Sequence, residues 1–282
     1  MKKVIIELLT AIMLTANTAY ADKFNDAVNS YESGKYKQAI RLFKPLALNG
    51  NVSAQFNLGL MYEKGQGVLQ DYVEAVKWYK LAAAQGDANA QFSLGVSYEN
   101  GQGLVQDYIE AVKWYKLAAA QGDAKAQINL GIMYGKGQGV VQDDVQAVKW
   151  YKLAAEQGDA KAQFNLGLMY AKGQGVVQDD VEAVKWYMLA AAQENAAAQY
   201  NLGLMYYKGR GVAQDYIQAY LWSNLAAMSG DKDSVINRDN IAKLMTKQQL
   251  AEAQKLAREC LARKYKGCQT KPKLTGTIRI MI

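Results

Sequence analysis

Histidine is absent from the sequence, and only two of its 282 residues are cysteine. Without histidine, a histidine general base, a Ser-His-Asp triad and an imidazole metal site are all excluded. After residue 21 no apolar run reaches the length of about 20 residues that a transmembrane helix needs. We therefore expect no metal site, and no membrane-spanning segment once the first 21 residues are removed.

A single stretch is copied along most of the chain. Residues 54–89 read AQFNLGLMYEKGQGVLQDYVEAVKWYKLAAAQGDAN, and copies with small changes follow at intervals of 36 residues. The copies begin at Ala54, Ala90, Ala126, Ala162 and Ala198, and the five tryptophans keep the same step. A fixed period between about 20 and 50 residues is typical of a stacked repeat array. Function is therefore expected on the surface of the array rather than in one catalytic pocket.

Each copy predicts two helices joined by a glycine loop. In the first helix Ala54 and Leu58 share one face, and Gly65 suits the left-handed residue that ends a helix. Asp71 and Glu74 have the spacing of a capping box, which predicts that the second helix starts there. The tryptophans recur at helical spacing with alanines in the second helix, and we interpret them as core residues.

The GQGV loops resemble phosphate-binding loops only superficially. Asp71 and its copies occupy the N-terminus of the following helix, where they would repel an anion. No Lys-Ser or Lys-Thr pair follows the loop. We interpret the loops as tight turns that need glycine, and we expect no cofactor.

The pattern A-x-x-x-L-G-x-x-Y-x-x-G-x-G-V-x-x-D, followed by A-x-x-W-Y-x-x-A-A-x-x-G, resembles the Sel-like repeat (SLR) of the tetratricopeptide-like superfamily. The resemblance covers residues 54–230 as five copies. It implies an all-α fold, a right-handed α-solenoid, that acts as a non-catalytic scaffold for protein interactions in the bacterial cell envelope or outside the cell. The alternative is a β-lactam-binding or β-lactamase-like enzyme, as described for cysteine-rich members. Those members carry a cysteine pair in each repeat, and the full repeats here have none.

The chain divides into five regions. Residues 1–21 resemble a signal peptide with an A-x-A site, so we expect cleavage after Ala21 and a periplasmic or secreted protein. Residues 22–50 read as a degenerate N-terminal capping repeat, and residues 51–230 as the five full repeats. Residues 231–268 predict a helical cap, with a capping box at Thr246 and Gln249. Residues 269–282 carry no clear signal, and a short strand and a disordered tail both remain open.

The net charge of +7 is unevenly distributed. Residues 22–231 contain 19 basic and 21 acidic residues, whereas residues 232–282 contain 12 basic and 4 acidic residues. A basic helix in the cap would suit an anionic surface or an acidic protein, and a solvated helix face explains the same charge. Nucleic acid is not an expected partner, because export separates the chain from it.

The two cysteines, Cys260 and Cys268, lie close together in the C-terminal region. In an exported chain such a pair favours a disulfide, which would pin the end of the last helix to the following loop. The alternative is a pair of free thiols, which requires a reducing compartment.

A polar stripe runs along the first helix of each repeat, outside the apolar clusters. Its members are spaced i, i+4, i+7 and i+11, so they share one face. By resemblance, the first helices line the concave surface of the array, where asparagines suit a peptide backbone and lysines favour acidic side chains. The residues predicted to contact a protein or peptide partner are Asn57, Lys64, Lys125, Asn129, Lys136, Lys161, Asn165, Lys172, Asn201 and Lys208. The alternative is that the asparagines bond within the stack and hold adjacent repeats in register.

Overall fold

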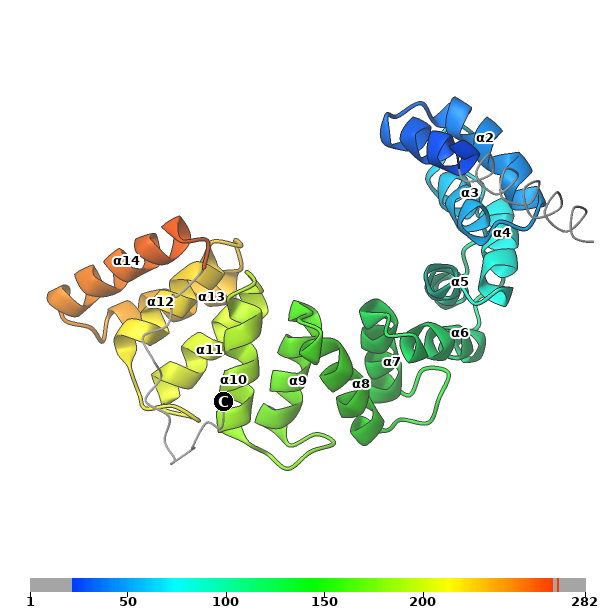
Figure 1. Cartoon of the computed structure of the whole chain (residues 1–282). Coiled ribbons are helices and arrows are strands. Elements are labelled where there is room, and N and C mark those ends of the chain that lie inside the picture. Colours follow the sequence, from blue (N-terminus) through cyan, green and yellow to red (C-terminus); the bar gives the residue numbers. More distant parts are fainter. Residues whose placement is uncertain (1–21, 266–267, 269–282) are drawn as a thin grey trace, which may run out of the picture. The chain divides into compact units, whose positions relative to one another are not determined.

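The computed structural model describes residues 22–265 and residue 268, and the protein is all-α. Residues 22–32 are helical, and the further helices follow in the order of Figure 1. These helices are α2 (Tyr36–Leu48), α3 (Val52–Lys64), α4 (Tyr72–Ala84), α5 (Ala88–Asn100), α6 (Tyr108–Ala120), α7 (Ala124–Lys136), α8 (Asp144–Glu156), α9 (Ala160–Lys172), α10 (Asp180–Ala191), α11 (Ala196–Lys208), α12 (Tyr216–Ala227), α13 (Lys232–Ala242) and α14 (Lys247–Ala262). The predicted signal peptide (1–21) and tail (269–282) lie outside the described residues.

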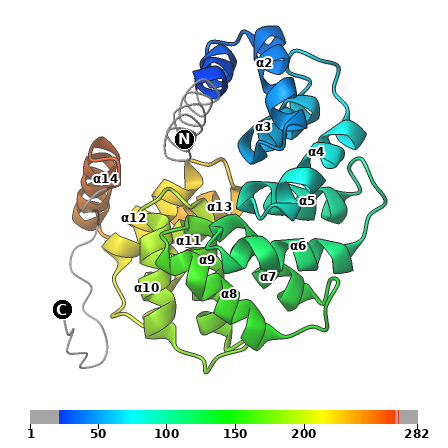
Figure 2. The same ribbon diagram turned by 45° about the vertical axis from the view of Figure 1, so that its right-hand side comes forward.

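The helices belong to two compact units. The first contains the described residues up to 126 together with residues 138–140, and the second contains residues 127–137 and those from 141 onward. Within the second unit α8, α9, α10 and α11 pack against one another in sequence order, as both views show (Figure 1, Figure 2). Repeats that are neighbours in the sequence are therefore neighbours in each unit.

Side chains cap the helices much as the sequence predicts. Asp71 accepts a hydrogen bond from the backbone amide of Glu74 at 2.9 Å, which starts α4. The side chain of Glu74 contacts Lys77 at 2.6 Å in an ion pair. At the start of α14, Thr246 and Gln249 form both halves of the predicted capping box.

A glycine in each first helix lets the second helix of the repeat approach closely. A Cβ added to Gly59 would lie 2.5 Å from the ring of Tyr79, which is too close for two atoms that are not bonded to each other. The same pairing joins Gly95 to Tyr115, Gly131 to Tyr151 and Gly167 to Tyr187. In the last repeat Ser223 replaces the tyrosine and accepts a hydrogen bond from Asn237 of α13 at 2.9 Å.

The second glycine of each GQGV loop packs against the preceding repeat. Gly175 has a φ of 68°, and a Cβ there would lie 2.8 Å from the backbone nitrogen of Val145 and still closer to the Asp144 carbonyl. Equivalent contacts join Gly67 to Tyr36, Gly103 to Tyr72, Gly139 to Tyr108 and Gly211 to Asp180. The loops predicted as glycine turns therefore also seat each repeat on the N-terminus of the second helix before it.

A buried glutamine in each first helix links neighbouring repeats. Gln163 donates to the carbonyl oxygen of Ala155 in the preceding repeat at 3.2 Å and accepts from Gln193 of its own repeat at 2.9 Å. The same arrangement joins Gln55 to Ala47 and Gln85, and Gln91 to Ala83 and Gln121, in the first unit. The series of donating glutamines stops at Ser229, which stands 36 residues after Gln193. These amides hold successive repeats in register.

The interpretation of all five tryptophans as core residues is wrong for three of them. Trp78 and Trp222 are buried, whereas Trp114, Trp150 and Trp186 are only partly buried. The tyrosine that follows each of these three is the buried residue, because it packs against the glycine of the first helix. Trp114 instead packs at the edge of a cluster formed by α4 and α5.

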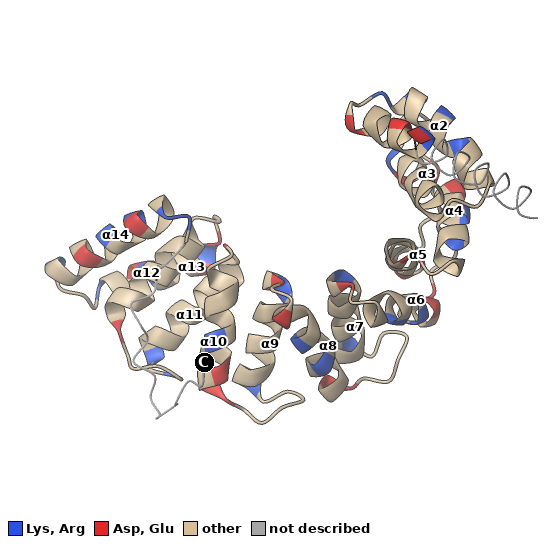
Figure 3. Cartoon of the chain, viewed as in Figure 1, with Lys and Arg blue, Asp and Glu red and all other residues tan. Residues whose placement is uncertain are grey.

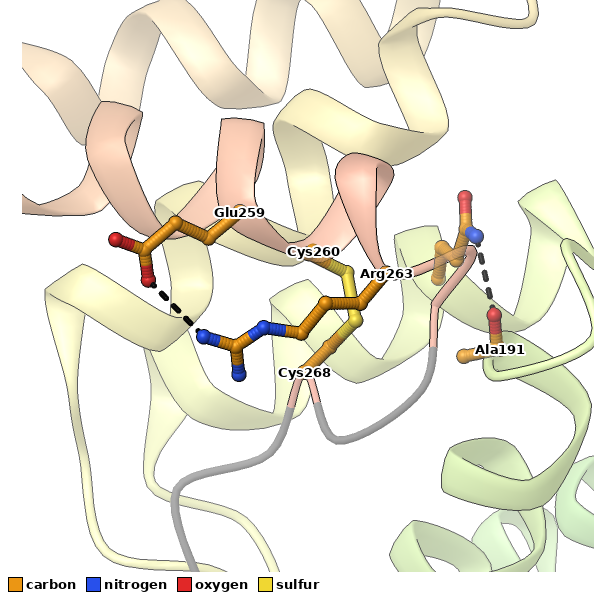
Figure 4. The surroundings of a disulfide bond; sticks show 6 residues. Ala191, Glu259, Cys260, Arg263 and Cys268 are labelled. Carbon is orange, nitrogen blue, oxygen red and sulfur yellow. Dashed lines mark hydrogen bonds and ion pairs between the residues drawn. A yellow bond between two sulfur atoms is a disulfide. The ribbon is translucent and has the colours of Figure 1, made fainter.

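The last two helices cover α12. Ile241 of α13 and Ala257 of α14 join the buried cluster that contains Trp222. Cys260 is bonded to Cys268 with Cα atoms 4.9 Å apart, so the predicted disulfide is present (Figure 4). Residues of both signs lie along α14 (Figure 3), so its surface is not uniformly basic.

Candidate functional site

The predicted polar stripe lies at the surface of the first helices. Its lysines are exposed and its asparagines are partly exposed. Five of the ten predicted residues line two hollows in the second unit, and these are Lys136, Asn165, Lys172, Asn201 and Lys208. The other five, which line neither hollow, are Asn57, Lys64, Lys125, Asn129 and Lys161.

The first hollow lies between α7 and α9 and has a volume of about 540 Å³. Ile132 contributes apolar lining, and the exposed side chains of Lys136 and Lys172 stand at its edge. Asp144, at the start of α8, lines it as well. The ring of Tyr151, only 7% exposed, also lines the hollow. The first hollow therefore combines an apolar surface, two cations, one carboxylate and a phenol.

The second hollow lies one repeat further on, between α9 and α11, and has a volume of about 170 Å³. It is lined by Leu168, Ala171, Lys172, Tyr187, Asn201, Leu204, Met205, Lys208 and Arg210. Each of these residues stands 36 positions after a residue that lines the first hollow. The chain thus builds the same site twice, and Leu168 and Lys172 belong to both.

One position differs between the repeats that have these hollows and the repeats before them. In the second repeat it is Glu99, which accepts a hydrogen bond from the Tyr115 hydroxyl at 2.5 Å, and the first repeat has the same arrangement. In the third and fourth repeats the position holds Gly135 and Ala171, each of which lines a hollow. The space that a glutamate side chain takes in the early repeats is therefore open in the later ones.

The tyrosine hydroxyls at the two hollows are free to donate. Among the described residues the structure records no acceptor for the hydroxyl of Tyr151 or Tyr187. Burial raises the pKa of both side chains to about 12, so both remain protonated at neutral pH. Beside Tyr187, Arg210 forms a two-point ion pair with Asp180, with nitrogen–oxygen distances of 2.7 and 3.0 Å.

The asparagines whose bonds the structure records turn to their own helices. Asn57 donates to the carbonyl oxygen of Ser53 at 2.8 Å, and Asn201 donates to that of Ala197 at 2.9 Å. A register role is therefore wrong for these two asparagines, because buried glutamines link the repeats instead. The remaining surface of Asn201 faces the second hollow.

The phenols and Arg210 at the hollows were not predicted from the sequence, and neither was the Ser-x-x-Lys sequence that runs from Ser229 to Lys232. The hydroxyl of Ser229 donates to the carbonyl oxygen of Ala226 at 2.7 Å, in the turn that ends α12. Within residues 22–265 and 268 no group of three or more His, Cys, Asp or Glu side chains is placed to hold a metal ion. No helix in that part of the chain has the length and apolar character to cross a membrane.

Comparison with known proteins identifies the repeats. The Sel1 repeat model matches residues 52–87, 88–123, 124–159, 160–195 and 196–231. The crystal structure of a protective antigen of uropathogenic Escherichia coli with an SLR fold has 34% identity, a TM-score of 0.79 and covers 91% of this chain, which spans 56% of the antigen. A Sel1 repeat protein from Oxalobacter formigenes has 37% identity and a TM-score of 0.71, covering 75% of this chain and 87% of its own length. A comparison with curated proteins found no match.

Proposed function

Because the chain belongs to the Sel1 repeat family, we propose that it is a non-catalytic scaffold that binds a segment of a partner protein on the first-helix face of its last three repeats. Sel1 repeats mediate protein interactions generally. The observation that carries the proposal is the pair of equivalent hollows along α7, α9 and α11. Two copies of one site, a single repeat apart, suit a partner that runs along the array rather than a single small molecule.

The lysines support an acidic partner. Lys136, Lys172 and Lys208 recur with the period of the repeat, are exposed, and stand at the hollows. No ion pair is recorded for any of the three among the described residues, so their charge is available to a partner. The Cys260–Cys268 disulfide is consistent with a location outside the cytoplasm, and we propose that the protein acts in the periplasm or is secreted.

The test is the double variant Lys136→Glu with Lys172→Glu, crosslinked in the native cell and followed by identification of the captured protein. Both side chains are exposed, so the circular dichroism spectrum and urea midpoint should not change. Capture should fall by about tenfold or more, because at each contact a cation is replaced by a carboxylate that repels the acidic partner.

The matched control is Lys149→Glu with Lys152→Glu, which makes the same charge change on exposed positions of α8. This control should capture the partner as the unaltered protein does. Undiminished capture by a folded Lys136→Glu, Lys172→Glu variant would place the partner elsewhere on the molecule.

A further inference from the structure

The chain itself shows which chemical group fits beside the tyrosine of a repeat. In the first unit Glu99 places a carboxylate oxygen 2.5 Å from the Tyr115 hydroxyl. Glu63 accepts a hydrogen bond from the Tyr79 hydroxyl in the repeat before. A phenol donates to a carboxylate in a charge-assisted hydrogen bond, which is stronger than a bond between neutral groups. The arrangement is therefore a carboxylate site that the protein fills with one of its own side chains.

The third and fourth repeats keep the donor and lose the acceptor. Tyr151 and Tyr187 are 7% and 1% exposed, and each lines one of the two hollows. The glutamate position is Gly135 in one repeat and Ala171 in the next. Each hydroxyl belongs to a residue that lines its hollow and has no acceptor recorded among the described residues, so an oxygen acceptor placed in the hollow can take its hydrogen bond.

The cations at the hollows select the charge of that acceptor. Lys172 and Lys208 line the second hollow, and Arg210 is held there by its ion pair with Asp180. A carboxylate near exposed ammonium groups gains Coulomb energy that a neutral amide does not. The lining of the first hollow includes the carboxylate of Asp144, which opposes a second anion.

We propose that each hollow binds one carboxylate side chain of an acidic partner segment, in the place that Glu63 and Glu99 occupy in the earlier repeats. The inference rests on the proposed function and specifies its chemistry. The partner's carboxylate accepts a hydrogen bond from Tyr187 or Tyr151 while the neighbouring lysines balance its charge. Because the two hollows repeat in step, the partner presents two acidic residues on one extended stretch. The second hollow is the stronger site, since Asp144 weakens the first.

The experiment uses the full mature chain and fluorescein-labelled peptides in a Gly-Ser background. Each peptide carries two glutamates at a different separation, and a matched peptide carries two glutamines instead. Fluorescence anisotropy at low ionic strength gives the affinities, because salt screens such contacts. We expect at least one glutamate peptide to bind about tenfold or more tightly than its glutamine counterpart.

The decisive variant is Ala171→Glu, which copies into the fourth repeat the residue that the first two repeats carry. The matched control is Ala192→Glu, an exposed position that is Glu156 one repeat earlier. Both variants add one negative charge by copying a residue from another repeat, so both should fold. Ala171→Glu should weaken the glutamate peptide by about tenfold and Ala192→Glu by less than about twofold. Tyr187→Phe, which removes only the hydroxyl, should weaken it by about threefold to tenfold.

Equal binding of glutamate and glutamine peptides, no binding of any glutamate peptide, or equal effects of Ala171→Glu and Ala192→Glu would each overturn the inference. These results leave the proposed function standing if the Lys136→Glu, Lys172→Glu variant still loses its native partner. Native capture that survives the lysine changes would overturn the proposed function itself. The two failures are therefore distinct.

Discussion

Replacing Gly175 with alanine tests whether the loop glycines hold neighbouring repeats together. A residue with a Cβ at a φ of 68° is disfavoured by about 1–2 kcal/mol on backbone grounds alone. The new Cβ would also lie 2.8 Å from the Val145 backbone nitrogen and nearer still to the Asp144 carbonyl. Both of these groups are backbone at the start of α8 and cannot rotate away. The loop must therefore move away from the start of α8, and we expect a total loss of about 3–5 kcal/mol in the free energy of unfolding.

The matched control is Gly158→Ala, because Gly158 has a φ of 93° and no atom within 4 Å of an added Cβ. This change keeps the backbone strain and removes the clash, so its loss should be about 1–2 kcal/mol. Urea titrations followed by far-ultraviolet circular dichroism give both values. A smaller dependence of the free energy of unfolding on urea concentration for Gly175→Ala would show that the repeats on either side unfold less cooperatively. Equal losses at the two sites would refute the role of the loop as an inter-repeat contact.

Three further predictions concern the repeat core and its titration. Gln163→Leu should lower stability by about 1–3 kcal/mol in urea titrations, because it removes two hydrogen bonds, to Ala155 and from Gln193, each contributing about 0.5–1.5 kcal/mol net; a neutral result would argue against the amide link. Tyr151→Ala should cost about 3–5 kcal/mol and Trp150→Ala clearly less, because Tyr151 is buried and Trp150 is only partly so; the reverse order would restore the tryptophan to the core. Burial raises the pKa of Tyr187 to about 12 from an ordinary value of 10.0. The contribution of Tyr187 to stability should therefore be complete below pH 10 and fall as the pH rises toward 12. Urea midpoints that stay constant between pH 10 and 12 would contradict this.

Local rules predicted the helices and their ends. Asp71 caps α4, and Thr246 with Gln249 begins α14, because a cap depends on residues only a few positions apart. The Cys260–Cys268 disulfide could be predicted for the same reason, because the two cysteines are close in the sequence. Five near-identical copies repeat these local signals, so a signal that is weak in one copy is supported by the same signal in the others. The family and its all-α fold follow from that redundancy.

The degree of burial was less predictable, because helical spacing places a residue on a face without saying how deeply that face is covered. Trp150 and Tyr151 are adjacent, and only the glycine opposite decided that the tyrosine takes the interior position. No prediction was made for Gln163 or Gln193, although the sequence contained a signal for them. Both series keep the same step, and the second stops at Ser229 where the array ends.

Half of the ten residues predicted from the stripe line the hollows, and the rest of the candidate site depended on how the copies differ. The stripe placed Lys136 and Lys172 correctly at the surface, because period and spacing fix a helix face. The hollows arise where Glu99 gives way to Gly135 and Ala171, and a search for shared residues passes over such a change. Comparing the copies with one another, rather than averaging them, would have found it.

The amide link between repeats has a direction, and this bears on how such a protein changes in length. Every copy that ends in glutamine supplies a backbone carbonyl that accepts from the next repeat, and a glutamine amide that donates to its own first helix. A duplicated segment inserted before residue 160 would therefore find matching donors and acceptors on both sides. A copy added after Ser229 would follow a repeat that has no such donor, and it would displace the cap that covers α12. Unequal recombination within the gene can therefore lengthen or shorten the array internally while both ends stay the same. The number of hollows can then change with the number of copies, without any new surface having to evolve.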